Sequence, residues 1–145
     1  MRIPPRRRAR EFALQGLYQW QMNRASAAEV LQNLSELEHF ASADQEFLRA
    51  ELNGVIREHD GLRAMIEPLV DRKWGEVSPV EKSILLIGAW ELAHALEIPY
   101  RVAINEGIEL AKRYGGTDGH KYVNGILDRL AAQARPDEFK PRTPA

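Results

Sequence analysis

Apolar residues recur at the spacing of an α-helix along almost the whole chain, and no segment alternates apolar and polar residues as a strand would. In the first such segment, near residues 6–24, one side of the expected helix carries Ala9, Phe12, Ala13, Gly16 and Trp20. Such a stripe must be covered by another apolar surface, so the pattern predicts an all-α fold of packed helices.

Start and stop signals divide the N-terminal half into four expected helices. The first should run from the arginines that follow Pro5 to about Arg24. Two sequences of the capping-box type, in which a serine precedes a glutamate or glutamine by three residues, predict helix starts at Ser26 and Ser42. Gly61 predicts a break, followed by a shorter helix.

The strongest start signal opens the C-terminal half. Ser78 and Pro79 combine an N-cap serine with a proline at the first helical position, and Glu81 follows at the third. The helix that follows is apolar nearly all round, which predicts a central, buried position before Pro99. Two more helices are expected over residues 101–114 and from residue 117 or 118 to residue 134, about seven in all.

Length and composition fit a single domain. We expect one helical domain over residues 1–134 and a flexible tail over residues 135–145, which contain three prolines. No apolar run is long enough to cross a bilayer, and the N-terminus lacks the apolar segment of a secretory signal. The absence of cysteine excludes disulfides and thiolate metal sites. These features predict a cytoplasmic protein without a membrane contact.

The charge distribution points to a polyanionic partner. Residues 1–10 contain five arginines and no acidic residue, although the whole chain has a net charge of −1. Arginines at a helix start oppose the helix dipole, so helix stability does not explain them, whereas phosphate binding does. On a helical wheel one face carries Arg7, Arg10, Leu14, Tyr18 and Gln21, a combination that suits single-stranded RNA. A basic terminus that only improves solubility is the alternative.

A di-iron enzyme is a second alternative, because the Glu-x-x-His pattern occurs at Glu36/His39 and at Glu91/His94. The first pair should face water, since it lies opposite the apolar stripe of its helix. One remaining pair cannot build such a centre. No phosphate-binding glycine loop or nucleophile motif is present, so we expect neither catalysis nor a cofactor or metal.

Four segments resemble the NusB family of transcription antitermination factors, and together they span nearly the full chain. They are RRRAREFALQGLYQWQ at residues 6–21, VEKSILLIGAWEL at 80–92, VAINEGIELAKRYG at 102–115 and HKYVNGILD at 120–128. The resemblance implies two small helical bundles packed together and no catalysis. It also implies binding to the boxA element of nascent ribosomal RNA transcripts, jointly with the ribosomal protein NusE, in the antitermination complex of RNA polymerase.

The resemblance also implies roles for single residues. It assigns RNA contacts to Arg6, Arg7, Arg10, Tyr18, Lys121 and Tyr122, and a NusE-facing surface to Glu76 and Glu81. Three further motif residues, Asn105, Glu106 and Asn124, are expected to bridge helices. Leu86 departs from the arginine of many relatives, which puts a polar contact there in doubt. A helical adaptor, or a homodimer whose arginines are nonspecific, stays open as the rival interpretation.

Overall fold

The computed structural model describes residues 2–140, which form seven α-helices, three one-turn 3-10 helices and no strand. The α-helices are α1 (Pro5–Asn23), α2 (Ala27–Ser35), α3 (Gln45–Arg57), α4 (His59–Ile66), α5 (Pro79–His94), α6 (Tyr100–Tyr114) and α7 (Gly119–Ala134). The connections contain the 3-10 helices η1 (Phe40–Ser42), η2 (Glu67–Leu69) and η3 (Trp74–Glu76). The expected all-α fold is confirmed.

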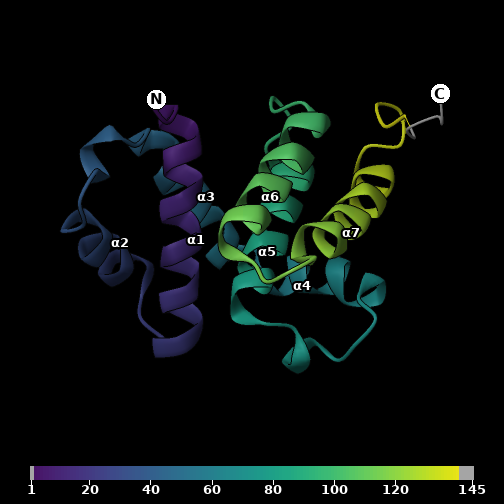
Figure 1. Cartoon of the computed structure of the whole chain (residues 1–145), viewed down its shortest axis with the longest axis horizontal. Helices are drawn as coiled ribbons and strands as arrows, with labels where there is room; N and C mark the ends of the chain where they lie inside the picture. The colour runs from purple at the N-terminus through teal and green to yellow at the C-terminus, as the bar shows by residue number, and fades with distance from the viewer. Residues whose placement is uncertain (1, 141–145) are drawn as a thin grey trace.

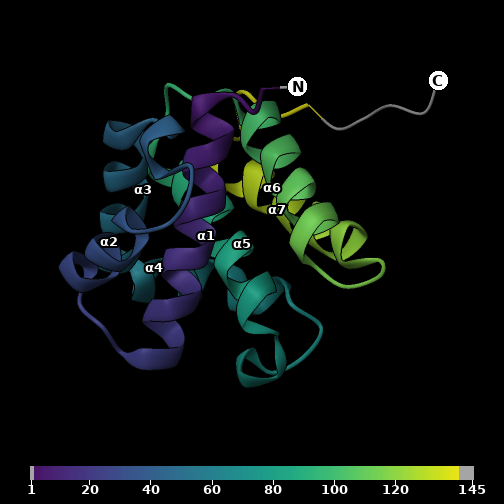
Figure 2. The same ribbon diagram turned by 60° about the vertical axis from the view of Figure 1, so that its left-hand side comes forward.

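The helices form two small bundles that share one core (Figure 1). Helices α1, α2 and α3 pack on one another, and α5, α6 and α7 form the second group, with α4 against α5. Both α1 and α3 also contact α5, so α5 joins the two bundles. Figure 2 shows α1 between the α2–α3 pair and the α5–α6 pair. The expected packing of two small bundles is therefore confirmed.

Helix α5 is the buried centre of the molecule, as its apolar sequence predicts. All residues from 83 to 92 are buried. The helix begins at the expected place, where the Ser78 hydroxyl accepts the backbone N–H of Glu81 at 3.1 Å and Pro79 occupies the first turn. Even this helix is too short for a bilayer, and no helix within residues 2–140 is long and apolar enough to span one.

Two predicted boundaries in the N-terminal half are wrong. Ser42 ends η1 and does not start α3, because Asp44 caps α3 by accepting the backbone N–H of Phe47 at 3.0 Å. Aspartate is as good an N-cap as serine, and its charge also favours a helix N-terminus. Gly61 lies inside α4, and the break falls at Glu58 between α3 and α4.

The expectation of a flexible tail from residue 135 is wrong for residues 135–140. The Arg135 side chain is buried and donates hydrogen bonds of 2.5–3.0 Å to the main-chain carbonyls of Glu91, Leu92, Ala95 and Ile98. Carbonyls at a helix end lack partners within the helix, and the five donors of a guanidinium can satisfy several of them at once. The remainder of the predicted tail, residues 141–145, lies outside the described residues.

Candidate nucleic-acid interface

The first turn of α1 carries the arginines that the sequence predicts for RNA. Pro5 starts the helix, and no carboxylate of α1 lies in that turn to offset their charge. Arg6 is exposed, with its guanidinium carbon 4.7 Å from the ring centroid of Phe47 and its Nε 3.8 Å from the Asp44 carboxylate. These contacts hold the start of α1 against α3, while the Arg6 guanidinium remains open to solvent.

Arg7 is also exposed, and a carboxylate from α6 fixes its direction. Its Nη2 donates to Glu106 Oε2 at 2.9 Å and its Nε to Oε1 at 3.3 Å. Glu106 accepts a further hydrogen bond of 3.3 Å from Arg10, so it bridges α6 to α1 as expected. The bridging expectation does not hold for Asn105, which is exposed, and the buried Asn124 amide oxygen has no hydrogen-bond partner within residues 2–140.

The prediction that Arg10 faces solvent beside Arg7 is wrong. Only 3% of Arg10 is exposed, and its guanidinium makes two parallel hydrogen bonds of 2.9 Å to the Glu91 carboxylate on α5. A buried charge is stable only when it is paired, and this two-point pairing is the strongest geometry available. A helical wheel places Arg10 near Arg7, but it cannot show that α5 covers that side of α1.

A second buried acid adjoins this pair. Glu51 on α3 is fully buried, and burial raises its pKa well above the usual value, as does the charge of Glu91. The positive charge of Arg10 opposes the rise without reversing it. Glu51 therefore remains a neutral acid where an ordinary glutamate is ionised. Its place on the apolar stripe of α3, between Phe47 and Val55, was a sequence signal for burial that we missed.

These contacts bear directly on the di-iron alternative. The Glu91 carboxylate is occupied by Arg10, and His94 is exposed at the end of α5. Glu36 and His39 are exposed as expected, but the reason differs, because α2 ends at Ser35 and neither residue lies on its helical turns. Within residues 2–140 no group of three histidine, aspartate or glutamate side chains could hold a metal ion.

Tyr18 lies where the sequence predicts, on the outer face of α1, with 42% of its surface exposed. It borders an open and mainly apolar groove of about 290 Å³ between α1, the start of α5 and the end of α6. Val80 and Tyr114 form the opposite side of this groove. Two phenol rings on one groove provide flat surfaces on which unstacked bases can lie.

Positive charge from α6 adds to that of α1, which the sequence alone did not indicate. Lys112 and Arg113 are exposed and line a groove of about 220 Å³ with Arg7. Arg113 Nη1 lies 3.0 Å from Glu11 Oε2 on α1, which holds the two helices together. The sequence signal was the dibasic and aromatic end of α6, Lys112 to Tyr114. Nothing in the sequence placed it beside the N-terminal arginines.

The second predicted RNA region, at the start of α7, lies apart from the N-terminal arginines (Figure 1). Lys121 is exposed, with its Nζ 3.4 Å from Asp118. Tyr122 is half-buried, and the guanidinium carbon of Arg72 lies 4.6 Å from its ring centroid. Burial raises the pKa of Tyr122, and its buried hydroxyl has no hydrogen-bond partner in the part of the chain described here.

The predicted partner surface adjoins this second region. Glu81 is half-buried, and a Cβ at Gly119, the first residue of α7, would lie 3.7 Å from its Oε1. Glu76 is exposed at the end of η3. Leu86 is fully buried in the core, so it presents no side chain at the partner surface.

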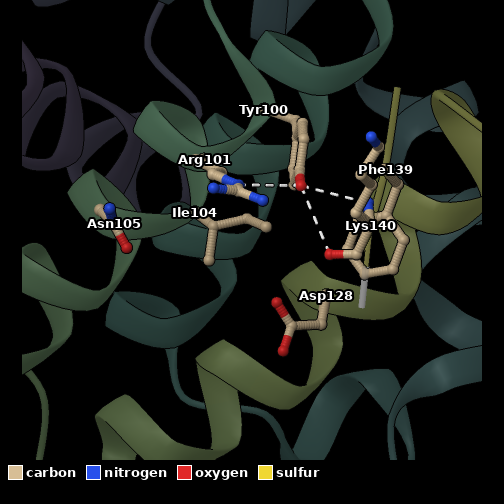
Figure 3. A pocket seen from close by; sticks show the side chains of 7 residues that line it. All are labelled: Tyr100, Arg101, Ile104, Asn105, Asp128, Phe139 and Lys140. Atoms are coloured by element: carbon tan, nitrogen blue, oxygen red, sulfur yellow. Dashed lines mark hydrogen bonds between the residues drawn. The ribbon is translucent and has the colours of Figure 1, made fainter. Parts of the chain in front are cut away.

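A further cavity, of about 260 Å³, lies at the start of α6 (Figure 3). There the Tyr100 hydroxyl accepts hydrogen bonds from Arg101 Nε at 2.9 Å and from the backbone N–H of Lys140 at 3.1 Å. The ring of Phe139 packs against Tyr100 with centroids 5.3 Å apart. These groups attach the C-terminal segment to α6, so we do not include this cavity in the RNA interface.

Comparisons with known proteins identify the family of the chain. The model of the NusB family matches residues 7–132. The transcription antitermination protein NusB of Thiobacillus denitrificans is 53% identical over 135 residues, which cover 93% of each chain. The protein of the same name from Burkholderia lata is 51% identical over 142 residues, 98% of each chain.

Two solved structures share the fold. T. maritima NusB superposes with a TM-score of 0.81 at 29% identity, covering 96% of this chain and 99% of that one. A crystal structure of the antitermination factors NusB and NusE with double-stranded RNA has a TM-score of 0.74 at 21% identity, covering 88% and 96%. Because the family match covers nearly the whole chain and the curated relatives are more than half identical, the chain belongs to the NusB family.

Proposed function

We propose that this chain is a transcription antitermination factor that binds the boxA element of nascent ribosomal RNA transcripts together with NusE. It acts in the cytoplasm as part of the RNA polymerase antitermination complex, supports ribosomal RNA synthesis, and has no catalytic activity and no cofactor. Its family and the names of its curated relatives support the antitermination role. The arrangement of side chains on α1 supports the RNA contact.

The observation that carries the RNA contact is the exposed pair of Arg7 and Tyr18 on one side of α1. They lie eleven positions apart, which is about three helical turns or about 16 Å along the axis. Arg6 adds charge at one end of this line, and Tyr114 adds a second ring at the other. Such a row offers guanidinium groups to phosphates and flat rings to bases.

Arg10 lies buried beneath this surface and contacts it through Glu106. Through Glu106 it fixes the carboxylate that directs Arg7, while its own guanidinium stays paired with Glu91. Lys121 provides a second phosphate contact at the start of α7. Tyr122, half-buried against the core and in contact with Arg72, offers a base only the part of its ring that remains exposed.

Glu76 and Glu81 form the NusE-facing surface in this proposal. The acidic pair suits a basic ribosomal protein, because complementary charge speeds encounter and fixes orientation. Its position beside the start of α7 allows RNA and NusE to bind next to each other. NusE would then strengthen the contact of the RNA with Lys121.

The test is binding of the full chain to a short boxA RNA and to a scrambled RNA, with and without NusE, at two salt concentrations. About four phosphate contacts give a log–log salt slope of roughly −3 for a single strand, or about a 50-fold loss between about 50 and 200 mM salt. We expect a preference for boxA that NusE strengthens. Arg7→Ala and Tyr18→Ala should each weaken binding, by about 1–3 kcal/mol for the lost ring.

Arg49→Ala is the matched control, because Arg49 is exposed on α3 away from this surface. Equal and weak binding to both RNAs would refute sequence-selective recognition. If NusE binding then survived alanine at Arg6 and Arg7, the chain would be the helical adaptor of the rival interpretation. Self-association without RNA binding would identify it as the homodimeric form of that rival.

A further inference from the structure

Another groove, separate from those described above, lies at the opposite end of α1 from the arginine-rich turn. We call it the tryptophan groove, because Trp20 and Trp74 line it. It runs between the last turn of α1, helix α4 and the region where η3 leads into α5. The end of α1 and η3 lie at the lower end of the molecule in Figures 1 and 2. The volume of this groove is about 630 Å³, and the two half-buried indoles form part of its wall. None of the residues to which the resemblance assigns RNA or NusE contacts lines it, although Gln21, which the sequence places on the same helical face as Arg7 and Tyr18, does.

The charged side chains of this groove are all cationic. Arg24, Arg63 and Lys82 line it, and no carboxylate does among residues 2–140. Arg63 pairs with Glu67 outside the groove, whereas Arg24 and Lys82 have no carboxylate partner within the described part of the chain. The groove between α1 and α6 differs in this respect, since three glutamates share its lining with the cations.

Two of these cations contact the same indole. The guanidinium carbon of Arg63 lies 5.7 Å from the Trp74 ring centroid, and the Lys82 ammonium lies 5.3 Å from it. Burial lowers the pKa of Lys82, and the charge of Arg63 lowers it further. The second effect is repulsion between two positive charges that border the same groove. An anion bound in the groove would offset this repulsion.

The aromatic wall favours a nucleotide chain over an acidic peptide. Trp20 meets the His59 ring edge-on at 5.0 Å, so the groove is bordered by flat apolar rings as well as by cations. Carboxylates of a peptide would use only the cations. A nucleotide unit would use both, with phosphate on Arg24 or Lys82 and its sugar and base against an indole.

The groove continues the row of Arg7 and Tyr18. Gln21 lies one turn beyond Tyr18 on α1 and lines the tryptophan groove. Its amide donates a hydrogen bond to the Ser83 hydroxyl at 2.7 Å. On α5, Val80 borders the groove beside Tyr18, and Lys82 borders the tryptophan groove. A strand that passes Tyr18 therefore reaches the tryptophan groove along α1 by way of Gln21.

We propose that the groove between Trp20 and Trp74 binds the sugar–phosphate backbone of the RNA strand beyond the segment held by Arg7 and Tyr18. The RNA footprint then extends along the whole length of α1. This inference rests on the proposed function, because it concerns a continuation of the same RNA. It assigns Arg24, Lys82 and Arg63 to phosphates outside the boxA segment.

The test compares a short boxA RNA with the same RNA extended by about six nucleotides at its 5′ or 3′ end, a length within the span of single-strand sites. For the unaltered full-length chain, one of the two extensions should tighten binding about tenfold. It should also steepen the log–log salt slope by about 1.4 if two phosphates are contacted. The double variant Arg24→Gln/Lys82→Gln should lose this gain and bind the short RNA unchanged.

The control is Arg49→Gln/Arg129→Gln, which removes two exposed charges from α3 and α7 and should keep the gain. Fluorescence gives a second measurement. Trp20 and Trp74 are partly open whereas Trp90 is buried, so the favoured extension should quench emission more than the short RNA does. Trp74→Phe should reduce that difference.

Failure of the inference is distinguishable from failure of the proposed function. If the short RNA binds selectively and neither extension adds affinity, the inference is overturned and the boxA assignment stands. If no RNA binds selectively, the proposed function fails with it. Binding of an acidic peptide that Arg24→Gln/Lys82→Gln abolishes, without any gain from longer RNA, would assign the groove to a protein partner and overturn the inference.

Discussion

Arg7 and Arg10 lie three positions apart in the same basic segment, yet the fold gives them different tasks. Arg7 stays exposed and is directed by Glu106, whereas Arg10 is buried against Glu91. Glu51 lies next to that pair as a third polar group, so α1, α3 and α5 meet at a buried cluster beneath the candidate RNA surface. Arg10 therefore links this cluster to that surface, because it pairs with Glu91 in the core and with Glu106, the carboxylate that directs the exposed Arg7.

The first residue-scale prediction concerns this difference. Arg10→Ala should lower the free energy of unfolding by about 3 kcal/mol, because it leaves the Glu91 carboxylate buried without its partner. Arg7→Ala, which removes an exposed pair, should lower it by less than about 1 kcal/mol. Urea denaturation of both variants measures the difference. Equal, small losses would show that the Arg10–Glu91 pair does not stabilise the fold.

The second concerns pH. The pKa of Glu51 is raised above the ordinary 4.5, so the folded chain holds this proton more tightly than the unfolded chain. The stabilisation is complete below about 4.5 and is lost as the pH rises through the raised pKa. Glu51→Gln, which mimics the neutral acid, should therefore gain stability relative to the unaltered chain from about pH 5 to about pH 8. Parallel pH profiles in urea denaturation would contradict a neutral Glu51.

At the scale of helices, the choice of cap decides where an element begins. The sequence offers Ser42 and Asp44 two positions apart, and the structure uses Asp44 for α3 while Ser42 closes η1. The first N–H groups of a helix have no partner within the helix, so a start at which a side chain accepts one of them is lower in free energy than a start without a cap. The cap of α3 also matters to the interface, because Asp44 is the carboxylate closest to the Arg6 guanidinium.

Asp44→Ala should lower the free energy of unfolding by about 1 kcal/mol through loss of the cap. Ser42→Ala is the control and should change it by less than about 0.5 kcal/mol. The exposed, 3.8 Å contact between Arg6 and Asp44 adds little to this difference. Thermal or urea denaturation checks both variants, and a larger loss in Ser42→Ala would restore the capping box expected from the sequence.

At the scale of the whole molecule, the C-terminal segment completes the second bundle. Arg135 reaches from the end of α7 to the last turn of α5 and the connection that leads to α6. Beyond it, the side chains of Glu138 and Phe139 contact Tyr100, the first residue of α6. The segment thus joins three helices at the end of the molecule where α5 finishes.

Arg135→Ala should lower the free energy of unfolding by about 3 kcal/mol, since it leaves several buried carbonyls without donors. Amide exchange should accelerate in the last turn of α5 and the first turn of α6. Arg129→Ala is the control, because Arg129 is exposed and its side chain donates a hydrogen bond to Gly125 within α7. Similar behaviour of the two variants would show that the C-terminal segment is only loosely attached.

The sequence by itself determined the elements. Helical periodicity, the Ser78–Pro79 start and the glycines after Tyr114 predicted the helices, because these signals act between residues a few positions apart. The resemblance of the motifs led to the family, and the comparisons confirmed it. The helical wheel also predicted that Arg7 and Tyr18 lie on the exposed face of α1.

Only the tertiary structure decided which polar groups are buried and which lie side by side. Arg10 and Glu91 are 81 positions apart, and Arg7 and Glu106 are 99 apart, so no local pattern could pair them. The same holds for Arg135 against α5 and for Trp20, Trp74 and Lys82 around one groove. A helical wheel describes the faces of one helix, whereas the partner of each face is set by how all the helices pack, because burial and pairing depend on distances in space and not along the chain.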